Sequence, residues 1–299
     1  MRLRPAHAAS WVNMMYENNE TLEMARARNV RDALYEDIGC GDWTAQLVAS
    51  ADDARAQVKA KQAMILCGSA WFEACLQALD AHVRVDWYYR DGDHVPHGAV
   101  VCAIVGRARA LLSAERSALN FLQMLSSVAT VTDQYVTAIR DVSPNPGGCR
   151  LLDTRKTLGG LRQAQKYAVR VGGGANHRMA LWEGILIKEN HIRAAGGIPA
   201  ALAAARALKS GADIQIEVED LDELAEALQA GATSILLDDF TLDTMRQAVR
   251  LNAGRALLEV SGGVDLHSVR AIAATGVDRI STGKLTKDIS AIDLSLRLL

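Results

Sequence analysis

The feature that most constrains the fold is an alternation of short apolar runs with helical segments in the second half of the chain. The apolar runs are RLLDT, GILIK, IQIEVE, SILLDD, ALLEVS and RISTG, and amphipathic segments such as LDELAEALQAG and TLDTMRQAVR separate them. Strands that alternate with helices indicate a parallel sheet, because each helix returns the chain to the same end of the sheet. At this length we expect a β/α barrel, with an open doubly wound sheet as the alternative.

Polar residues follow each of these apolar runs. In a barrel the carboxyl ends of all strands point to one mouth, where such folds place their chemistry. The sequence therefore predicts a single site formed by the strand ends 153–156 (DTRK), 188–190 (KEN), 217–219 (EVE), 238–239 (DD), 261–263 (SGG) and 282–283 (TG).

Cationic side chains gather near these strand ends although the formal net charge of the chain is only -2. Arginine can hold a carboxylate or phosphate through two parallel hydrogen bonds, whereas lysine acts as a compact point charge. Like charges near an apolar core repel each other, so an anionic ligand would relieve a cost that the empty site bears. We therefore expect a pocket for a multiply charged anion, with these candidate residues: Arg116, Arg155, Lys156, His177, Arg178 and Lys188.

A second group of cations is spaced four residues apart. Arg162, Lys166 and Arg170 have the spacing of one helix face. We interpret them as a solvated face or as partners of local acids, and not as part of the pocket. The isolated histidines, His191 among them, have no spacing typical of metal ligands and are expected to be structural.

Acids and glycines complete the predicted mouth. Glu217 and Asp238 could ligate Mg²⁺ or accept hydrogen bonds from sugar hydroxyls, although acids at strand ends also cap the following helix. Ser261, Gly262 and Gly263, together with Gly283, follow the last two strands, where barrels often bind a phosphate through backbone N–H groups.

The first part of the chain, roughly residues 1–115, has a different pattern. A helix is expected over 20–36, strands over 54–60 and 83–89, and an Asp-Gly turn before a further strand in 99–112, which predicts an antiparallel hairpin. A long helix is expected from Ser113 to about Arg140, with Leu119, Leu122, Leu125 and Val128 on its buried face. This part is interpreted as an α+β layer with an open sheet.

Composition excludes several classes of protein. Nearly balanced charge gives no support for binding nucleic acid or a membrane surface. The five cysteines are scattered without the spacing of a zinc site, so we expect reduced thiols in a cytoplasmic protein. Residues 1–19 lack the apolar run of a signal peptide, and no apolar stretch reaches the length of a membrane-spanning helix.

The ordered motifs DTRKT, GLR, KYAV, GGGANHR, LIKENH, EVE, LLDD, EVSGG and TGVDRISTGKLT resemble the quinolinate phosphoribosyltransferase family, also called carboxylating nicotinate-nucleotide pyrophosphorylase. The likeness extends over nearly the whole chain, since ERSALNFLQMLS and MILCG also match. The resemblance implies an incomplete β/α barrel of the type II phosphoribosyltransferases with an N-terminal α+β open-sheet domain. It implies domains at 1–118 and 119–283, with 284–299 returning to the first.

The resemblance also implies an activity. A pentosyltransferase of this family would transfer phosphoribose from phosphoribosyl pyrophosphate to quinolinate and release pyrophosphate and carbon dioxide, giving nicotinate mononucleotide for NAD synthesis. The alkylated ring nitrogen can stabilise the electrons left by the departing carboxylate, so no organic cofactor or covalent enzyme intermediate is expected. Magnesium is the implied cofactor.

Roles for individual residues are carried over by motif. The resemblance assigns quinolinate binding to Arg116, Arg155, His177, Arg178 and Lys188. It assigns catalysis to Lys156, Glu217 and Asp238, and metal binding to the two acids. It assigns phosphoribosyl pyrophosphate binding to Lys156, Glu217, Asp238, Ser261, Gly262, Gly263, Gly283 and Lys287. A homodimer is implied, in which Arg116 reaches the site of the neighbouring subunit.

Some positions depart from the family pattern. Gly159 stands where proline is common, Ser127 where glycine is common, Lys287 where histidine is common and Glu183 where aspartate is usual. Two other functions stay open: a nicotinate phosphoribosyltransferase, which would need only one carboxylate clamp, and a non-catalytic anion-binding accessory protein of the same superfamily, like those associated with molybdenum transport. The set of five quinolinate-clamp residues argues against the first, and retention of Glu217 and Asp238 argues against the second.

Overall fold

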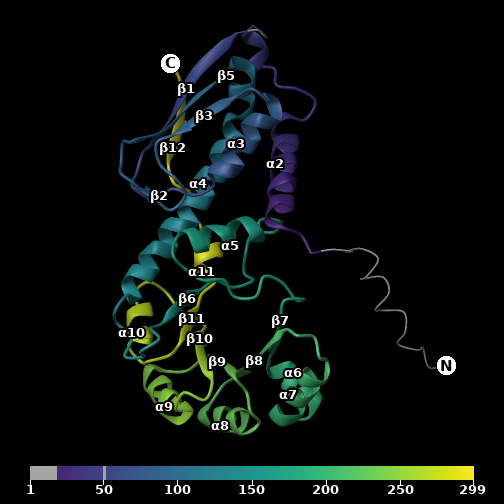
Figure 1. The fold of residues 1–299 in the computed structure, drawn as a ribbon, viewed down its shortest axis with the longest axis vertical. Coiled ribbons are helices and arrows are strands. Elements are labelled where there is room, and N and C mark those ends of the chain that lie inside the picture. Colours follow the sequence, from purple (N-terminus) through teal and green to yellow (C-terminus); the bar gives the residue numbers. More distant parts are fainter. Residues whose placement is uncertain (1–18, 50–51) are drawn as a thin grey trace, which may run out of the picture.

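The computed structural model describes residues 19–49 and 52–299, so the interpretation of the first 18 residues lies outside the described part. Two β-sheets lie at opposite ends of the molecule, and one long helix connects them (Figure 1). One sheet is antiparallel and comes from the first part of the chain and its last strand. The other is parallel and comes from the second part, as the change of pattern along the sequence predicts.

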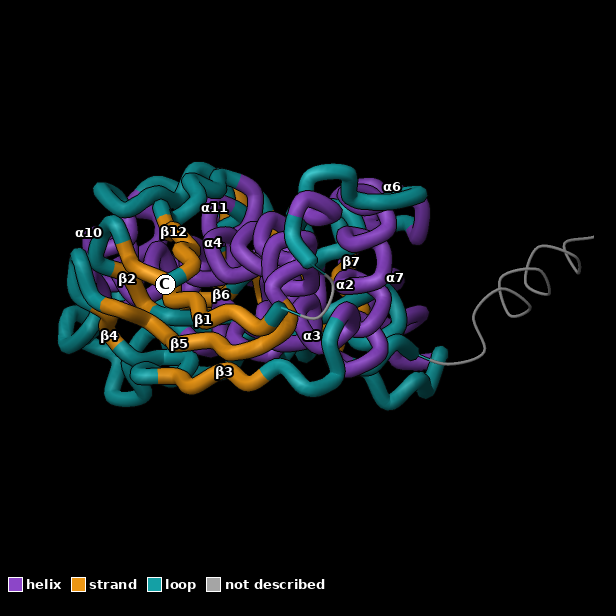
Figure 2. The backbone as a smooth tube through the Cα atoms, turned by 90° about the horizontal axis from the view of Figure 1, so that it is seen from above, coloured by secondary structure: helices purple, strands orange, loops and turns teal. Residues whose placement is uncertain are grey.

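The first sheet has four antiparallel strands in the order β12-β1-β5-β3, which lie side by side in Figure 2. They are β1 (Asp53–Ala60), β3 (Arg84–Trp87), β5 (Val100–Arg107) and β12 (Leu294–Leu298), and a separate pair is formed by β2 (Met64–Ile65) and β4 (His94–Val95). The predicted pairing of 83–89 with the following strand is confirmed, because β3 pairs with β5. The last strand, β12, pairs with β1, so the end of the chain joins the first sheet.

Helices lie next to this sheet, each in contact with the long connecting helix. They are α2 (Leu22–Ile38), the short 3₁₀ helix η1 (Ala45–Leu47) and α3 (Ser69–Leu79). Thr21 caps α2, because its hydroxyl accepts a hydrogen bond from the Met24 N–H at 3.2 Å. Trp71 and Phe72 of α3 are fully buried against the core.

The connecting helix α4 (Ala108–Ile139) has 32 residues. It begins five residues before the predicted start at Ser113, because the segment RARALL consists of strong helix formers and leaves the strand at Arg107. Leu119, Leu122, Leu125 and Val128 are at most 1% exposed, which confirms the predicted buried face. The domain boundary expected after residue 118 falls inside this helix, and the division into domains stays a prediction.

The second sheet has six parallel strands in the order β6-β11-β10-β9-β8-β7. They are β6 (Arg150–Leu152), β7 (Gly184–Ile187), β8 (Asp213–Val218), β9 (Ser234–Asp238), β10 (Leu257–Ser261) and β11 (Arg279–Ser281). β6 and β7 form the two edges and do not pair with each other, so the strands of the described chain form no closed barrel. Beside β6 the gap is lined by the segment at Ala175, which forms a parallel bridge with Leu152.

Helices lie on the outer side of this sheet (Figure 1). They are α5 (Arg162–Val171), α6 (Glu189–Ala195), α7 (Ile198–Ala207), α8 (Leu221–Gln229), α9 (Leu242–Asn252), α10 (Val269–Ala273) and α11 (Lys284–Lys287). Asp220 caps α8 by accepting the Glu223 N–H at 2.8 Å, and the Glu223 carboxylate accepts the N–H of Glu219. The fold is thus the expected α/β architecture with an incomplete barrel. Within residues 19–49 and 52–299, none of the helices is both long and apolar enough to cross a membrane.

Candidate active site

The carboxyl ends of the six parallel strands carry most of the predicted site residues. Arg155 and Lys156 follow β6 and Lys188 follows β7. Glu217 lies near the end of β8, and Asp238 and Ser261 end β9 and β10. Because all six strands run in the same direction, these side chains share one edge of the sheet. The strand ends that the sequence analysis assigned to the mouth thus lie at one edge of the sheet, and their residues make the following contacts.

Arg155 and Arg178 form a cationic pair without a carboxylate partner. Burial, and then the nearby charge of Arg155, lower the pKa of Arg178 from its ordinary value. Arg178 donates from Nη1 to the Gly184 carbonyl at 2.9 Å. Nε of Arg155 is buried and has no hydrogen-bond partner. Among the described residues no ion pair joins either arginine to an acid, so both keep donors for an external anion.

Lys188 contacts an acid and not the two arginines. Its ammonium lies 2.5 Å from Oε2 of Glu217, and this pair bridges the ends of neighbouring strands β7 and β8. The Lys188 side chain is half exposed, while that of Glu217 is only 11% exposed. Because half of its side chain is exposed, Lys188 can also contact an anion from the solvent side.

Lys156 approaches the backbone at Gly283. A Cβ at Gly283 would lie 3.0 Å from Cδ and 3.1 Å from Cβ of Lys156, which is closer than ordinary van der Waals contact. The loop after β11 is further tied to this segment, because the Thr286 hydroxyl donates to the Lys156 carbonyl at 2.8 Å. Lys287, one helix turn on, forms an exposed ion pair with Asp288 at 3.0 Å. A side chain at position 283 would therefore force the Lys156 side chain to shift.

The loop after β10 lies beside Asp238. Gly262 and Gly263 have φ values of 91° and 59°, a region that favours glycine. A Cβ at Gly262 would lie 3.2 Å from Oδ1 of Asp238. Ser261 is in register with Asp238 in the neighbouring strand, and its hydroxyl donates to the Ser281 carbonyl at 3.5 Å. The backbone of this loop thus passes close to the Asp238 carboxylate.

Carboxylates gather on the β8 side of the mouth. The pKa of Glu219 is raised, first by desolvation and then by the charges of Glu189, Glu223, Asp238 and Glu217. Within the described part of the chain, no group of three or more His, Cys, Asp or Glu side chains is arranged to hold a metal ion by itself. A pair of carboxylates still suits Mg²⁺, which usually keeps several waters and binds one or two carboxylates together with substrate phosphates.

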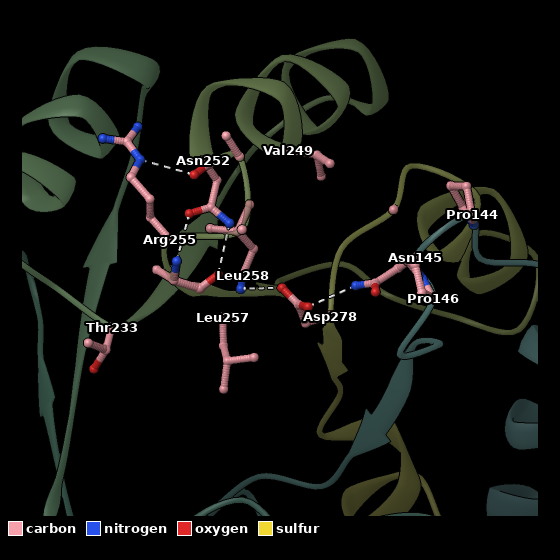
Figure 3. A pocket seen from close by; sticks show the side chains of 14 residues that line it. Pro144, Asn145, Pro146, Thr233, Val249, Asn252, Arg255, Leu257, Leu258 and Asp278 are labelled. Carbon is pink, nitrogen blue, oxygen red and sulfur yellow. Dashed lines mark hydrogen bonds between the residues drawn. The ribbon is translucent and has the colours of Figure 1, made fainter.

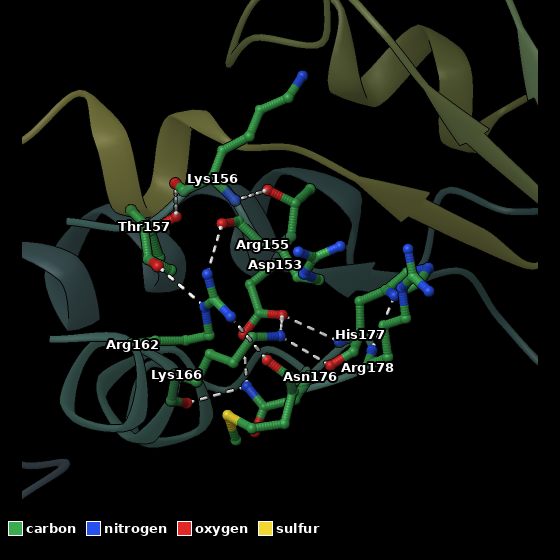
Figure 4. A network of polar contacts seen from close by, with 12 residues as sticks. Asp153, Arg155, Lys156, Thr157, Arg162, Lys166, Asn176, His177 and Arg178 are labelled. Carbon is green, nitrogen blue, oxygen red and sulfur yellow. Dashed lines mark hydrogen bonds and ion pairs between the residues drawn. The ribbon is translucent and has the colours of Figure 1, made fainter. Parts of the chain in front are cut away.

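A buried ion pair between Lys166 and Asp153 lies next to Arg155, His177 and Arg178 (Figure 4). Nζ of Lys166 lies 2.5 Å from Oδ1 of Asp153, and both side chains are 0% exposed. Lys166 also donates to the His177 carbonyl at 2.7 Å, and Asp153 accepts the His177 N–H at 2.9 Å and the Asn176 amide at 2.5 Å. Burial raises the pKa of Asp153 and lowers that of Lys166, while their mutual attraction opposes both shifts.

The residues of the 162–170 helix face divide between the two interpretations, a solvated face and partners of acids. Arg170 is exposed, as expected, but Lys166 points into the core and holds the segment that carries His177 and Arg178. Arg162 donates to the Thr157 hydroxyl at 3.2 Å and so contacts the loop after β6. The missed signal was Asp153, an acid directly after a buried apolar run, since a buried carboxylate requires a partner.

His177 points into the barrel. Nδ1 accepts the N–H of Arg178 at 2.7 Å, and Nε2 lies 3.0 Å from Oε1 of Gln215. Gln215 and Glu259 are polar residues inside apolar runs, and this is the sequence signal by which they could have been found. The assignment of His177 to quinolinate stays a prediction.

Arg116 lies apart from the mouth. It is exposed on α4, and within the described part of the chain no hydrogen bond or ion pair joins it to the residues at the strand ends. The structure of one subunit therefore does not bring Arg116 together with Arg155 and Arg178.

Two of the cavities lie at the amino ends of the parallel strands, away from their carboxyl ends. One of about 590 Å³ lies at the opposite edge of the sheet, where Leu257 and Leu258 begin β10, and Asp278 there accepts from Asn145 and from the Leu258 N–H (Figure 3). None of the predicted site residues lines it. A second cavity, of about 480 Å³, is lined by His177, Arg178 and Gln215, and Arg155, Lys156 and Lys188 lie outside its lining.

Comparisons with known proteins agree with this fold. The model of the quinolinate phosphoribosyl transferase N-terminal domain matches residues 42–126, and the model of the C-terminal domain matches residues 128–297. A probable nicotinate-nucleotide pyrophosphorylase [carboxylating] of Bacillus subtilis is 40% identical over 262 residues, 87% of this chain and 89% of the relative. The nicotinate-nucleotide pyrophosphorylase [carboxylating] of Mycobacterium leprae is 38% identical over 279 residues, 90% of this chain and 95% of the relative.

A solved structure with the same fold is also similar in sequence. The nicotinate-nucleotide pyrophosphorylase of Francisella tularensis superposes with a TM-score of 0.89 at 45% identity, covering 94% of this chain and 98% of that one. Human nicotinic acid phosphoribosyltransferase, at 15% identity and a TM-score of 0.60, shares the fold alone. Both family models and the relatives match over most of the chain, and the chain therefore belongs to the quinolinate phosphoribosyltransferase family.

Proposed function

We propose that this chain is a decarboxylating quinolinate phosphoribosyltransferase. It transfers phosphoribose from phosphoribosyl pyrophosphate to the ring nitrogen of quinolinate and releases pyrophosphate and carbon dioxide, which yields nicotinate mononucleotide for NAD synthesis. The observation that carries the proposal is the pair Arg155 and Arg178, which lie close together without a carboxylate partner and include a buried guanidinium nitrogen with no acceptor.

Quinolinate fits this cationic pair because it carries two adjacent carboxylates. A guanidinium can hold each carboxylate through parallel hydrogen bonds, and such charge-assisted bonds strengthen when water is excluded. Lys188 supplies a further charge at the neighbouring strand end. Nicotinate has one carboxylate and would leave part of this set unpaired, so the geometry favours the diacid.

The sugar donor is proposed to bind across the other strand ends. Lys156, next to Gly283, faces the loop that would hold a phosphate, and Ser261 with Gly262 and Gly263 forms a second loop near Asp238. Lys287 is a further candidate for the donor phosphates. Glu217 and Asp238 would accept hydrogen bonds from the ribose hydroxyls and oppose positive charge that develops on the sugar.

The reaction divides into two steps. The ring nitrogen of quinolinate attacks the anomeric carbon as the bond to pyrophosphate breaks, and the nitrogen becomes positively charged. The bond to the adjacent carboxylate then breaks, carbon dioxide leaves, and the electron pair left on the ring carbon takes a proton from water. Both steps need positioned cations and no covalent bond to the protein.

Glu217 and Asp238 are the residues that would hold Mg²⁺. When bound, the metal would offset negative charge on the leaving pyrophosphate. Two carboxylates at neighbouring strand ends support this proposal, because Mg²⁺ binds through few protein ligands and the phosphates of its substrate.

We also propose a homodimer with shared sites. Arg116 is exposed, and among the described residues no hydrogen bond or ion pair joins it to the strand ends of its own subunit. Tyr35, Trp43 and Leu47 are each at least 78% exposed. The segment with Trp43 is tied to α4, because the Ser113 hydroxyl donates to Asp42 at 2.8 Å, one turn from Arg116. Exposed apolar side chains, together with an arginine that has no partner among residues 19–49 and 52–299, favour cover by a second subunit. The cytoplasmic location stays a prediction.

The test is direct. Purified protein is incubated with quinolinate, phosphoribosyl pyrophosphate and Mg²⁺, and nicotinate mononucleotide and carbon dioxide are measured. Nicotinate replaces quinolinate in a parallel reaction. We expect product from quinolinate only; product from nicotinate alone would instead favour a nicotinate phosphoribosyltransferase, and no product from either would favour a binding protein.

A further inference from the structure

Two polar side chains lie in the barrel below the mouth. Glu259 precedes Ser261 by two positions in β10, and Gln215 precedes Glu217 by two positions in β8. Residues two apart on a strand share a face, so both side chains point the same way as the mouth residues that follow them. Glu259 is 1% exposed and Gln215 is 7% exposed. The proposed reaction does not use either of them directly.

A chain of hydrogen bonds runs from the backbone of Arg178 through His177 and Gln215 to Glu259. The Arg178 N–H donates to Nδ1 of His177, so that nitrogen carries no proton. The ring proton of the neutral imidazole is then on Nε2, which lies 3.0 Å from Oε1 of Gln215. The amide of Gln215 donates from Nε2 to Oε2 of Glu259 at 3.0 Å. Each hydrogen bond from Arg178 to Glu259 therefore pairs one donor with one acceptor.

The second carboxylate oxygen of Glu259 has no hydrogen bond. It is buried and lies 3.5 Å from Nε2 of His177. Buried carboxylate oxygens without a hydrogen-bond partner are uncommon in folded proteins. The negative charge of Glu259 lies next to the nitrogen that carries the ring proton, where it favours the Nε2–H tautomer over the alternative.

We infer that Glu259 and Gln215 are positioning residues for the quinolinate clamp. They fix the tautomer and orientation of His177, and the ring in turn holds the backbone of Arg178 so that its guanidinium stays beside Arg155. Both ring nitrogens of His177 have partners within the protein, so the residues that hold the ring also set where His177 and Arg178 lie. This inference rests on the proposed function for the identity of the ligand.

Kinetics of single variants give the first test. Glu259→Gln and Gln215→Leu are expected to raise the KM for quinolinate about tenfold, the equivalent of one hydrogen bond to a charged group, and to leave kcat and the KM for phosphoribosyl pyrophosphate unchanged. Val260→Ala, which removes a buried side chain from the other face of β10, is the matched control. It should lower the Tm and leave the quinolinate KM unchanged. Unchanged quinolinate KM values in both positioning variants would refute the inference.

A double-mutant cycle tests whether Glu259 acts through His177. In His177→Asn the amide oxygen can still accept the Arg178 N–H, but the contact with Gln215 is lost. Adding Glu259→Gln to this variant should not raise the quinolinate KM further, because the chain is already broken. Additive effects on the KM would contradict the inference.

The tautomer can be measured without any assay of activity. In protein with ¹⁵N-labelled histidine, one of the seven histidines is assigned to His177 by its loss in His177→Asn. We expect an unprotonated Nδ1 and a protonated Nε2 in the unsubstituted protein. A ring protonated on Nδ1 would overturn the inference even in a fully active enzyme, whereas failure to form product from quinolinate would count against the proposed function alone.

Discussion

The ammonium of Lys166 lies 2.5 Å from the carboxylate of Asp153, and neither side chain is exposed. Asp153 comes directly after β6, and Lys166 lies in the middle of α5. Through Asn176 and the backbone of His177, this pair fastens the segment that carries Arg178 to the strand that leads to Arg155. The two arginines of the proposed clamp are thus held by one buried ion pair.

Removing one member of this pair should strongly destabilise the protein. Lys166→Met leaves a buried carboxylate without its counter-charge, which costs about 3 to 5 kcal/mol of unfolding free energy. Urea unfolding followed by circular dichroism measures the change. Arg170→Met, an exposed position on the same helix, is the control and should change the unfolding free energy by less than about 0.5 kcal/mol. A similar small effect for both variants would argue that the pair is not needed for stability.

A methyl group at position 283 should interfere with binding of the sugar donor. In Gly283→Ala the new Cβ would lie 3.0 Å from the Lys156 side chain and displace it. We expect the KM for phosphoribosyl pyrophosphate to rise about tenfold while the KM for quinolinate stays the same. Gly159→Ala is the matched control, because nothing lies within 4 Å of a Cβ there. Equal kinetics in the two variants would refute the proposed role of this loop.

Shared sites can be tested by mixing two inactive variants. Arg116→Ala and Asp238→Ala should each lose activity, because one lacks a clamp residue and the other an acid at the mouth. If Arg116 serves the neighbouring subunit, mixed dimers contain one intact site, and unfolding and refolding the two together should restore up to about a quarter of the wild-type activity. Light scattering gives the mass of the assembly. A mixture that stays inactive, or a monomeric enzyme, would contradict the shared site.

Part of the protein's stability should be lost at acid pH. Backbone N–H groups of Arg107 and then His82 lower the pKa of Asp80 below its ordinary value of 3.8. A group with a lowered pKa in the folded state contributes stability above its unfolded pKa and loses it as the pH falls through the folded value. Between pH 6 and pH 3 the Tm of the wild type should therefore fall more than that of Asp80→Asn. Asp86→Asn, at an exposed position, should follow the wild type; equal acid sensitivity in all three proteins would exclude a contribution from Asp80.

Much of the fold could be predicted because most helices and strands have a recognisable pattern within their own stretch of sequence. Apolar runs between amphipathic helices indicated the parallel sheet, and polar residues after them located the mouth. The start of α4 was misplaced by five residues, since RARALL suits both a strand end and a helix. Lys166, Gln215 and Glu259 were not predicted as supports of the site, because their burial depends on partners far away in sequence. The orientation of His177 depends in the same way on contacts with β8 and β10.

The central claim is that Arg155 and Arg178 together bind the two carboxylates of quinolinate, and calorimetric titration of quinolinate tests it most directly. Arg155→Met and Arg178→Met should each weaken binding by about tenfold or more, since each removes charge-assisted hydrogen bonds, while Arg170→Met should bind as the wild type does. Wild-type affinity for quinolinate in both clamp variants would contradict the account.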